Sequence, residues 1–386
     1  MKLPVYLDYA ATTPVDPRVA EAMARCLTMD GVFANPASRS HIYGWQAEEQ
    51  VELARRHVAE LLSADPRDVV WTSGATESNN LALKGVFEAL NYQGHLITTA
   101  IEHKAVIDPT KWLEARGVAV TYLMPGKDGR VSVEQVQAAL RPDTRLVSVM
   151  HINNETGVVN PVADIGALCR AANVLLHVDA AQSAGKIPLD VSALQVDMLS
   201  LSAHKFYGPK GVGALYVRRA IAHQVKPQIH GGGHERGLRS GTLATHQLVG
   251  IGEAARLCIE QQEADAERTA RLRDQLWQGI SGLPTIARNG STEWLSPIHL
   301  NVNFGAVDGE ALLLSLRDIA VSSGSACTSA SMEPSYVLKA MGLTDAQAHS
   351  SVRISLGRFT TADDVQRAVA HIVDVVASLQ SQPALG

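Results

Sequence analysis

The stretch VLLHVDAAQSAG, residues 174–185, decides the fold together with DMLSLSAHKFYGPKGVGALYV, residues 197–217. Each stretch begins with a short apolar run, which is typical of a buried β-strand. The second stretch continues through a Gly/Pro turn into another apolar run, GALYV, at 213–217. Polar residues follow the first two runs where the strands are expected to end. The sequence therefore predicts a sheet edge that carries chemically useful side chains.

Outward from these stretches, apolar runs alternate with segments of helical periodicity from about residue 69 to residue 217. Segments such as ESNNLALKGVFEAL (77–90) are long enough to be crossover helices. We therefore predict an α/β fold in which a seven-stranded, mostly parallel sheet carries helices on both faces. The predicted strands are VVWT (69–72), HLITT (95–99), VAVTYL (118–123), LVSVM (146–150), VLLHV (174–178), DMLSLS (197–202) and GALYV (213–217).

The pattern changes after GGGHERGLRSGT (231–242). Residues 243–280 are polar and amphipathic and predict one long or broken helix. Three later apolar runs, together with a last helix from Thr361, predict a small α+β domain. These runs are IHLNVNF (298–304), IAVSS (319–323) and SVRISL (351–356). We expect a large domain over residues 1–255 and a small C-terminal domain over 256–386, and the N-terminal segment is a candidate to pack on the small domain.

The 386-residue chain has 34 Lys and Arg against 39 Asp and Glu, a formal net charge of −5, and 46% hydrophobic residues. This composition excludes disorder as the main state, and without a cluster of basic residues it gives no reason to expect nucleic-acid binding. No run approaches the ~20 apolar residues of a membrane helix and the start lacks a signal-peptide pattern, so we expect a cytoplasmic protein. Cys26, Cys169, Cys258 and Cys327 are far apart, so neither a metal site nor a disulfide framework is predicted.

The segment TSGATESNN, residues 72–80, follows an apolar strand and opens a helix. Its small residues let the backbone approach an anion, and the helix N-terminal amides with the Thr76 hydroxyl could bind a phosphate. The alternative is an ordinary helix cap in which Ser73 or Thr76 satisfies the first amides. The segment matches neither the dinucleotide-binding nor the P-loop glycine pattern.

Asp179 ends the apolar run at 174–178, and Gln182 follows three residues later. Ligands bind at the carboxyl edge of a parallel sheet. A carboxylate there could pair with a cationic ring nitrogen of a cofactor while Gln182 reaches another polar atom. A solvated loop aspartate is the alternative.

Ser202, His204 and Lys205 follow the next apolar run and precede a Gly/Pro turn. A neutral lysine amine at such a sheet edge can form a Schiff base. Lys210, in the turn GPKG, is the competing lysine. Its place in an exposed turn predicts a surface role.

Cys327 lies in SSGSACTSAS (322–331), where no apolar periodicity would bury it. The other three cysteines lie on helical patterns and are predicted to be core thiols. A thiol on a loop of small residues suits nucleophilic attack followed by movement, and an inert loop cysteine is the alternative.

Further polar residues accompany the predicted strands. His103 follows the second strand and could stack on a planar cofactor, although a capping or core role is more common. Asn154 and Glu155 follow the fourth strand. Arg353 lies within a strand of the small domain, which suggests bidentate capture of a carboxylate, with a structural ion pair as the alternative.

Taken together, these segments resemble the cysteine desulfurases, a group of class V aminotransferase-like pyridoxal-phosphate enzymes. The resemblance implies fold type I, a homodimer, and pyridoxal phosphate attached to Lys205. It also implies conversion of L-cysteine to L-alanine, with the sulfur held as a persulfide on Cys327. SSGSAC resembles the long-loop, NifS-like branch that serves iron–sulfur assembly. The matching segments, in the family's order, are YLDYAATTP, NPASRSHIYGWQAEE, TSGATESNNLALKG, EHKAVI, NNETG, VDAAQS, SAHKFYGPKG, GGGHERGLRSGT, SSGSACTSAS and SSVRISLGRFT.

The resemblance also assigns roles around the cofactor. Asp179 would hold the pyridine nitrogen, Gln182 the phenolic oxygen, and His103 would stack on the ring and relay protons. The residues implied at the phosphate are Ala75, Thr76, Ser202 and His204, joined by Thr242 from the partner subunit.

The resemblance further places Asn154 beside cofactor and substrate. It also implies that Arg353, together with Asn35, binds the substrate carboxylate. Housekeeping desulfurases that feed iron–sulfur scaffolds usually extend beyond the last helix, whereas this chain stops at Gly386. The sulfur acceptor is therefore open among an iron–sulfur scaffold, a tRNA-thiolation relay and a DNA phosphorothioation system. Two rival functions are a class V aminotransferase or lyase without persulfide chemistry, and a non-catalytic sulfur-relay subunit.

Overall fold

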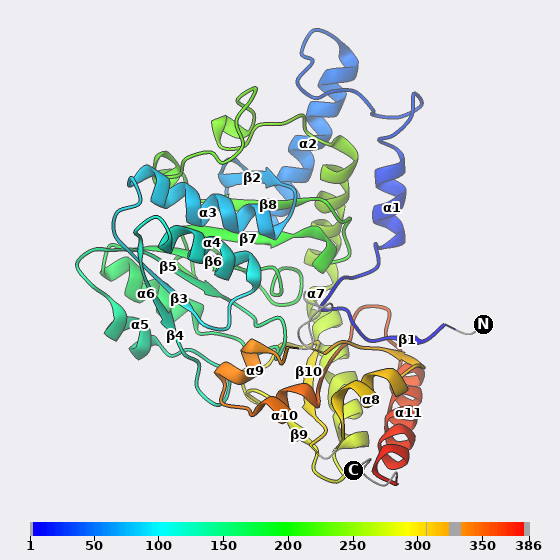
Figure 1. Ribbon diagram of the computed structural model, residues 1–386. Helices are drawn as coiled ribbons and strands as arrows, with labels where there is room; N and C mark the ends of the chain where they lie inside the picture. The colour runs from blue at the N-terminus through cyan, green and yellow to red at the C-terminus, as the bar shows by residue number, and fades with distance from the viewer. Residues whose placement is uncertain (1–2, 306, 324–332, 382–386) are drawn as a thin grey trace.

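A seven-stranded sheet forms the centre of the larger part of the molecule in the computed structural model, which describes residues 3–305, 307–323 and 333–381 (Figure 1). Its strand order is β2-β8-β7-β6-β5-β3-β4. β8 pairs antiparallel with β2 and β7, and the other pairs are parallel. The predicted mostly parallel sheet is confirmed. Its strands are β2 (Val69–Thr72), β3 (His95–Thr99), β4 (Ala119–Leu123), β5 (Thr144–Met150), β6 (Leu175–Asp179), β7 (Met198–Ser202) and β8 (Gly213–Val217).

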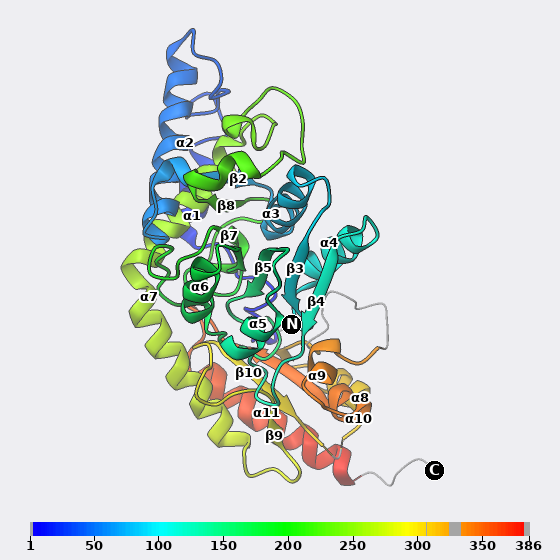
Figure 2. The same cartoon turned by 90° about the vertical axis from the view of Figure 1, so that its left-hand side faces the viewer.

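Helices cover both faces of this sheet, as Figure 2 shows with α3 and α4 on one side and α2 and α6 on the other. Alternate residues of one strand serve the two faces, because side chains alternate along a strand. Val69 and Trp71 of β2 belong to one hydrophobic core, and Val70 belongs to the other. The α-helices of this part are α1 (Pro17–Ala24), α2 (Ile42–Leu61), α3 (Ala75–Ala89), α4 (Lys104–Glu114), α5 (Val133–Ala139) and α6 (Val162–Ala171), and the 3₁₀ helices are η1 (Pro66–Asp68), η2 (Ala203–Lys205), η3 (Arg219–Gln224) and η4 (Glu235–Gly237).

The C-terminal part contains a smaller antiparallel sheet of order β12-β10-β9 and a two-stranded sheet of β1 and β11. β1, from the N-terminus, pairs in parallel with β11, and Val5 and Leu7 share a core with Leu300 and Ile372. The N-terminal segment therefore packs on this part. Its elements are β1 (Val5–Tyr6), β9 (Ala287–Arg288), β10 (His299–Asn303), α8 (Gly309–Ser315), β11 (Ile319–Ala320), α9 (Tyr336–Ala340), α10 (Asp345–His349), β12 (Ser351–Ser355) and α11 (Ala362–Ser381).

Helix α7 (Thr245–Ile280) is one continuous helix of 36 residues that runs beside both parts (Figure 1). Leu248 and Ile251 pack under the large sheet, whereas Leu272 and Leu276 pack in the C-terminal core. The boundary expected after residue 255 falls inside this helix. The division of the chain at that residue stays a prediction. Within the described ranges, no helix combines the length and apolarity that a membrane crossing requires.

A buried ion pair joins α2 to the segment that follows β8. Arg55 donates from Nη1 and Nη2 to the two carboxylate oxygens of Glu235, at 2.7 and 2.9 Å. Glu235 Oε2 also accepts the backbone N–H of Trp71 at 2.8 Å, and Arg55 Nη1 donates to the carbonyl of Val69 at 2.9 Å. The pair therefore attaches residues 231–242 to the edge strand β2.

We expect Glu235→Gln to lower the free energy of unfolding by about 3 kcal/mol, because it removes the buried anionic partner of Arg55 and leaves only the more exposed Glu52 carboxylate beside that buried charge. Urea unfolding followed by circular dichroism measures the change. Glu21→Gln is the matched control, since Glu21 pairs with Arg25 on the exposed face of α1, and it should change stability little. A loss no larger in Glu235→Gln than in Glu21→Gln would show that the buried pair contributes nothing.

Candidate active site

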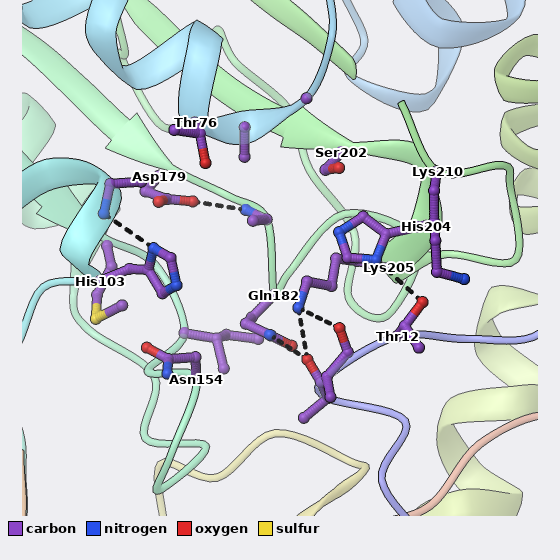
Figure 3. A pocket seen from close by; sticks show the side chains of 18 of the residues that line it. Thr12, Thr76, His103, Asn154, Asp179, Gln182, Ser202, His204, Lys205 and Lys210 are labelled. Carbon is purple, nitrogen blue, oxygen red and sulfur yellow. Dashed lines mark hydrogen bonds between the residues drawn. The ribbon is translucent and has the colours of Figure 1, made fainter. Parts of the chain in front are cut away.

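A cavity of about 590 Å³ lies at the carboxyl ends of β6 and β7, between the N-termini of α3 and α4 (Figure 3). The N-terminal residues 10–12 form part of its wall. This is the position at which open α/β sheets bind ligands. The predicted site residues that line it are Ala75, Thr76, His103, Asn154, Asp179, Gln182, Ser202, His204, Lys205 and Arg353.

Lys205 ends the 3₁₀ helix η2, directly after strand β7. Its Nζ donates to the carbonyl oxygens of Ala10 and Ala11, at 2.7 and 2.8 Å. Figure 3 shows the side chain reaching across to the N-terminal segment. The amine is thus held at the cavity by backbone acceptors from a segment almost 200 residues away in the sequence.

Asp179 is the last residue of β6 and is only 6% exposed. Its Oδ2 accepts from Asn79 Nδ2 at 2.7 Å, and its Oδ1 accepts from the backbone N–H of Ala181 at 2.9 Å. The carboxylate is therefore fixed from α3 and from its own turn, and the alternative of a solvated loop aspartate is wrong.

The N-terminus of α3 is built for close approach of a ligand. Gly74 is its N-cap, with φ +151°, a backbone conformation that favours glycine, and no side-chain cap is formed in the described structure. The alternative in which Ser73 or Thr76 caps the helix is therefore wrong. Glu77 instead accepts the N–H of Ser73 at 2.7 Å and pairs with Arg239 at 2.8 Å. The helix end faces the cavity between Thr76 and Ser202 (Figure 3).

Two histidines lie on the cavity wall. His103 is the N-cap of α4, and its Nδ1 accepts the N–H of Ala105 at 3.0 Å, which leaves Nε2 to carry the ring proton. The predicted capping role and a place in the site are thus both realised. His204 Nδ1 lies 3.1 Å from Thr12 Oγ1. Burial and the nearby Lys205 and Lys210 charges lower the pKa of His204 to about 4, so its ring is neutral at physiological pH.

Arg353 is held on β12 at the opposite wall. Its Nη2 donates to Asp8 Oδ1 at 2.7 Å, and its Nη1 donates to the Asn154 carbonyl at 2.9 Å. Within the described residues, Arg353 Nε and Asn154 Oδ1 are buried and have no hydrogen-bond partner. The ion pair proposed as an alternative for Arg353 is present, and the same guanidinium lines the cavity.

Other predicted residues lie elsewhere. Asn35 lines a separate cavity of about 270 Å³ with Arg39 and His234, and Thr242 is exposed outside the main cavity. Cys327 lies outside the described residues. Lys210 is exposed, as predicted, but it also lines the main cavity, which the prediction of a surface role did not include. The turn folds back over the site, which local sequence does not predict.

Glu102 is a buried residue beside the site that sequence analysis missed. Its Oε1 accepts from Thr99 Oγ1 and from the backbone N–H of Met150, both at 2.8 Å. Burial, supported by the charge of Asp179, raises the pKa of Glu102 to about 8. The carboxyl is therefore protonated at neutral pH. Glu155, after Asn154, is also buried and accepts a hydrogen bond from Ser335, and burial raises its pKa.

Comparison with known proteins identifies relatives over the whole chain. Residues 5–368 match the family model described as Aminotransferase class-V. The cysteine desulfurase IscS of Aeromonas hydrophila is 59% identical over 386 residues, which cover 100% of this chain and 96% of the relative. A solved structure described as a NifS-like protein is 38% identical with a TM-score of 0.90, covering 98% of this chain and 100% of that one. Another, SspA in complex with cysteine, is 43% identical with a TM-score of 0.82, covering 92% and 99%.

We expect Glu102 to make stability fall as pH rises. Its pKa is about 8 in the folded chain and close to 4.3 in an unfolded one, so the native state binds more protons between these values. The stabilisation is full below the unfolded pKa and is lost as pH rises through the folded pKa. Glu102→Gln should therefore reduce the fall in unfolding free energy between pH 5 and pH 8 by roughly 2 to 4 kcal/mol.

Urea unfolding at several pH values tests this expectation. Glu134→Gln, at an exposed position in α5, is the matched control and should keep the wild-type pH dependence. If Glu102→Gln kept that dependence too, Glu102 would be ionised in the folded chain.

Proposed function

Because the chain belongs to the class-V aminotransferase family, among the cysteine desulfurases, we propose that it binds pyridoxal phosphate at Lys205 and passes the sulfur of L-cysteine through Cys327. The observation that carries the proposal is the convergence of three features on one cavity. They are the Lys205 amine, the buried Asp179 carboxylate, and the N-terminus of α3, which no side chain caps in the described structure.

The residues of the cavity fit this cofactor. A carboxylate fixed by two donors suits a protonated ring nitrogen, and a helix N-terminus suits a phosphate. Thr76, Ser202 and His204 line the cavity near that helix end, so hydroxyl and imidazole groups are available to the phosphate oxygens. The buried Asn154 Oδ1, which has no partner among the described residues, marks a polar atom that a ligand can satisfy.

When bound, pyridoxal phosphate would supply an electron sink that acidifies the Cα proton of an amino acid and takes up the electrons left on the carbon side when the carbon–sulfur bond breaks. In our proposal Lys205 holds the cofactor and afterwards moves the Cα proton. Asp179 keeps the ring nitrogen charged, and Gln182 donates to the phenolic oxygen. His103, whose Nδ1 is engaged by Ala105, stacks on the ring and exchanges a proton at Nε2.

Arg353 is proposed to bind the substrate carboxylate. Its planar guanidinium can donate to both carboxylate oxygens, and its hydrogen bonds to Asp8 and to the Asn154 carbonyl fix its orientation. Asn154 would then contact cofactor and substrate together. Asn35 lines another cavity of the same chain, so we propose that it contributes to the carboxylate site of the neighbouring subunit.

Cys327 is proposed as the nucleophile that takes the sulfur. The other three cysteines are buried, and burial raises the pKa of each thiol, to about 12 for Cys169 and about 11 for Cys258. Because the thiolate is the nucleophile, these three are poor candidates. Cys327 attacks the substrate sulfur, the carbon–sulfur bond breaks, and the bonding electrons stay with the carbon fragment that becomes alanine. The persulfide then passes to an acceptor.

Exposed apolar residues on α2 and on the loop between α1 and α2 support a homodimer. They are Leu27, Met29, Phe33, Ile42, Tyr43 and Trp45, each between 42% and 72% exposed. Clusters of this kind mark protein interfaces. We propose that a second copy covers them and that Thr242 completes the partner's phosphate site. The sulfur acceptor is proposed to be a cytoplasmic protein of one of three systems, namely iron–sulfur scaffolding, tRNA thiolation or DNA phosphorothioation.

We expect Cys327→Ser to bind pyridoxal phosphate like the wild type and to form no alanine from L-cysteine, because serine provides no sulfur acceptor. In the wild type, one turnover should leave one extra sulfur on the peptide that contains Cys327, as measured by mass spectrometry. Cys26→Ser is the control and should keep wild-type turnover. Alanine formation by Cys327→Ser would favour the lyase alternative, and sulfur on Cys169 or Cys258 would overturn the assignment.

We also expect Tyr43→Glu to convert the dimer to a monomer and to weaken cofactor binding, because the phosphate site loses Thr242 of the partner subunit. Light scattering gives the mass, and absorbance titration gives the affinity. Leu314→Glu, at an exposed position in α8, is the control and should leave both unchanged. A wild-type monomer with full cofactor affinity at assay concentration would refute the shared site.

A further inference from the structure

Lys186 is a buried lysine next to the site, in the turn that follows β6. It is only 7% exposed, although lysine is almost never buried without an anionic partner. Among the described residues, no carboxylate forms an ion pair with it. Its Nζ donates to Oε1 of Gln182 at 3.3 Å. A buried lysine amine with a single amide partner calls for an explanation.

The turn that carries Lys186 packs tightly against the residue that follows Lys205. Gly185 has φ +71°, and a Cβ at this position would lie 2.6 Å from Phe206 Cβ and 2.8 Å from Cys258 Sγ. Only glycine fits there, so the turn packs directly on α7 and on the residue that follows Lys205. Lys186 does not line the cavity, whereas Gln182, to which it donates, does.

A chain of hydrogen bonds leads from Lys186 to Lys205. Gln182 accepts from Lys186 at Oε1, and its Nε2 donates to the carbonyl of Ala10 at 2.8 Å. Lys205 Nζ donates to the same carbonyl at 2.7 Å. Figure 3 shows Gln182 and Lys205 converging on the N-terminal segment.

We propose that Lys186 is a positioning residue, which fixes the amide of Gln182 so that its N–H donor end, and not its carbonyl end, faces the cofactor and the Ala10 carbonyl. An ammonium group has three donors and no acceptor, so a charged Lys186 can pair only with Oε1. The reversed amide would set its NH₂ group against the ammonium and its oxygen against the cofactor's phenolic oxygen. This inference rests on the proposed function, because it assumes pyridoxal phosphate in the cavity.

The charge of Lys186 also acts on the site. Lys205 and Cys258 are the titratable groups that influence Lys186, and His204 and His299 in turn feel its charge. Burial and the charge of Lys205 lower the pKa of Lys186 to about 7. The repulsion is mutual, so a charged Lys186 disfavours a further positive charge on the nitrogen of Lys205.

The test compares Lys186→Met, Gln182→Met and the double variant as holoenzymes. We expect Lys186→Met to raise the pH midpoint of the bound cofactor's visible absorbance change by roughly 0.5 to 1 unit. We also expect it to weaken pyridoxal-phosphate affinity about fivefold to tenfold, the worth of one hydrogen bond. If Lys186 acts through Gln182, the double variant binds the cofactor no more weakly than Gln182→Met alone.

Two further variants complete the experiment. Lys186→Gln keeps an amide donor without the charge, so it should raise the midpoint while losing less affinity than Lys186→Met. Lys127→Met, at an exposed position, should behave as wild type. Additive affinity losses, or a midpoint unchanged in both Lys186 variants, would overturn the inference. A wild-type protein that bound no pyridoxal phosphate would instead overturn the proposed function.

Discussion

The site depends on one physical constraint, the hydrogen bonding of residues 8–16 to two separate parts of the chain. On one side, the N–H of Thr13 donates to the His204 carbonyl at 2.9 Å, and Lys205 Nζ donates to Ala10 and Ala11. On the other side, the N–H of Ala10 donates to Ser355 Oγ at 2.8 Å. The segment thus ties the residues after β7 to strand β12. Without it, the lysine from the large sheet and the arginine from the small sheet would have no common wall.

The electrostatics of this wall follow from the same arrangement. Lys205, Lys210 and Arg353 bring positive charge to one cavity, which suits ligands that carry a phosphate and a carboxylate. His204 is neutral at physiological pH and adds a hydrogen-bonding group without adding charge. The carboxylate of Asp179 stands apart from these cations because Asn79 holds it on the side of α3. Cation-rich and anionic ends are therefore separated within one cavity.

Sequence reasoning reached the sheet and the sheet-edge residues because both follow from local patterns. Short apolar runs place the strands, helical spacing places the helices between them, and the carboxyl-edge rule then places Asp179 and Lys205. It missed contacts made across long sequence separations, such as Asp8 with Arg353 and Glu102 with Met150. It also treated Lys210 as a surface residue, because nothing in GPKG reveals that the turn folds over the cavity. The burial of Lys186 could not be predicted, because a lysine in a turn is normally exposed and nothing in its neighbouring residues indicates otherwise.

The most direct test of the account is to identify the lysine that carries the cofactor. Borohydride reduction of the purified protein loaded with pyridoxal phosphate, followed by proteolysis and mass spectrometry, locates the phosphopyridoxyl group on one peptide. The account predicts modification of Lys205, whose Nζ is held at the cavity by Ala10 and Ala11. Modification of Lys186 or Lys210 in place of Lys205 would contradict it.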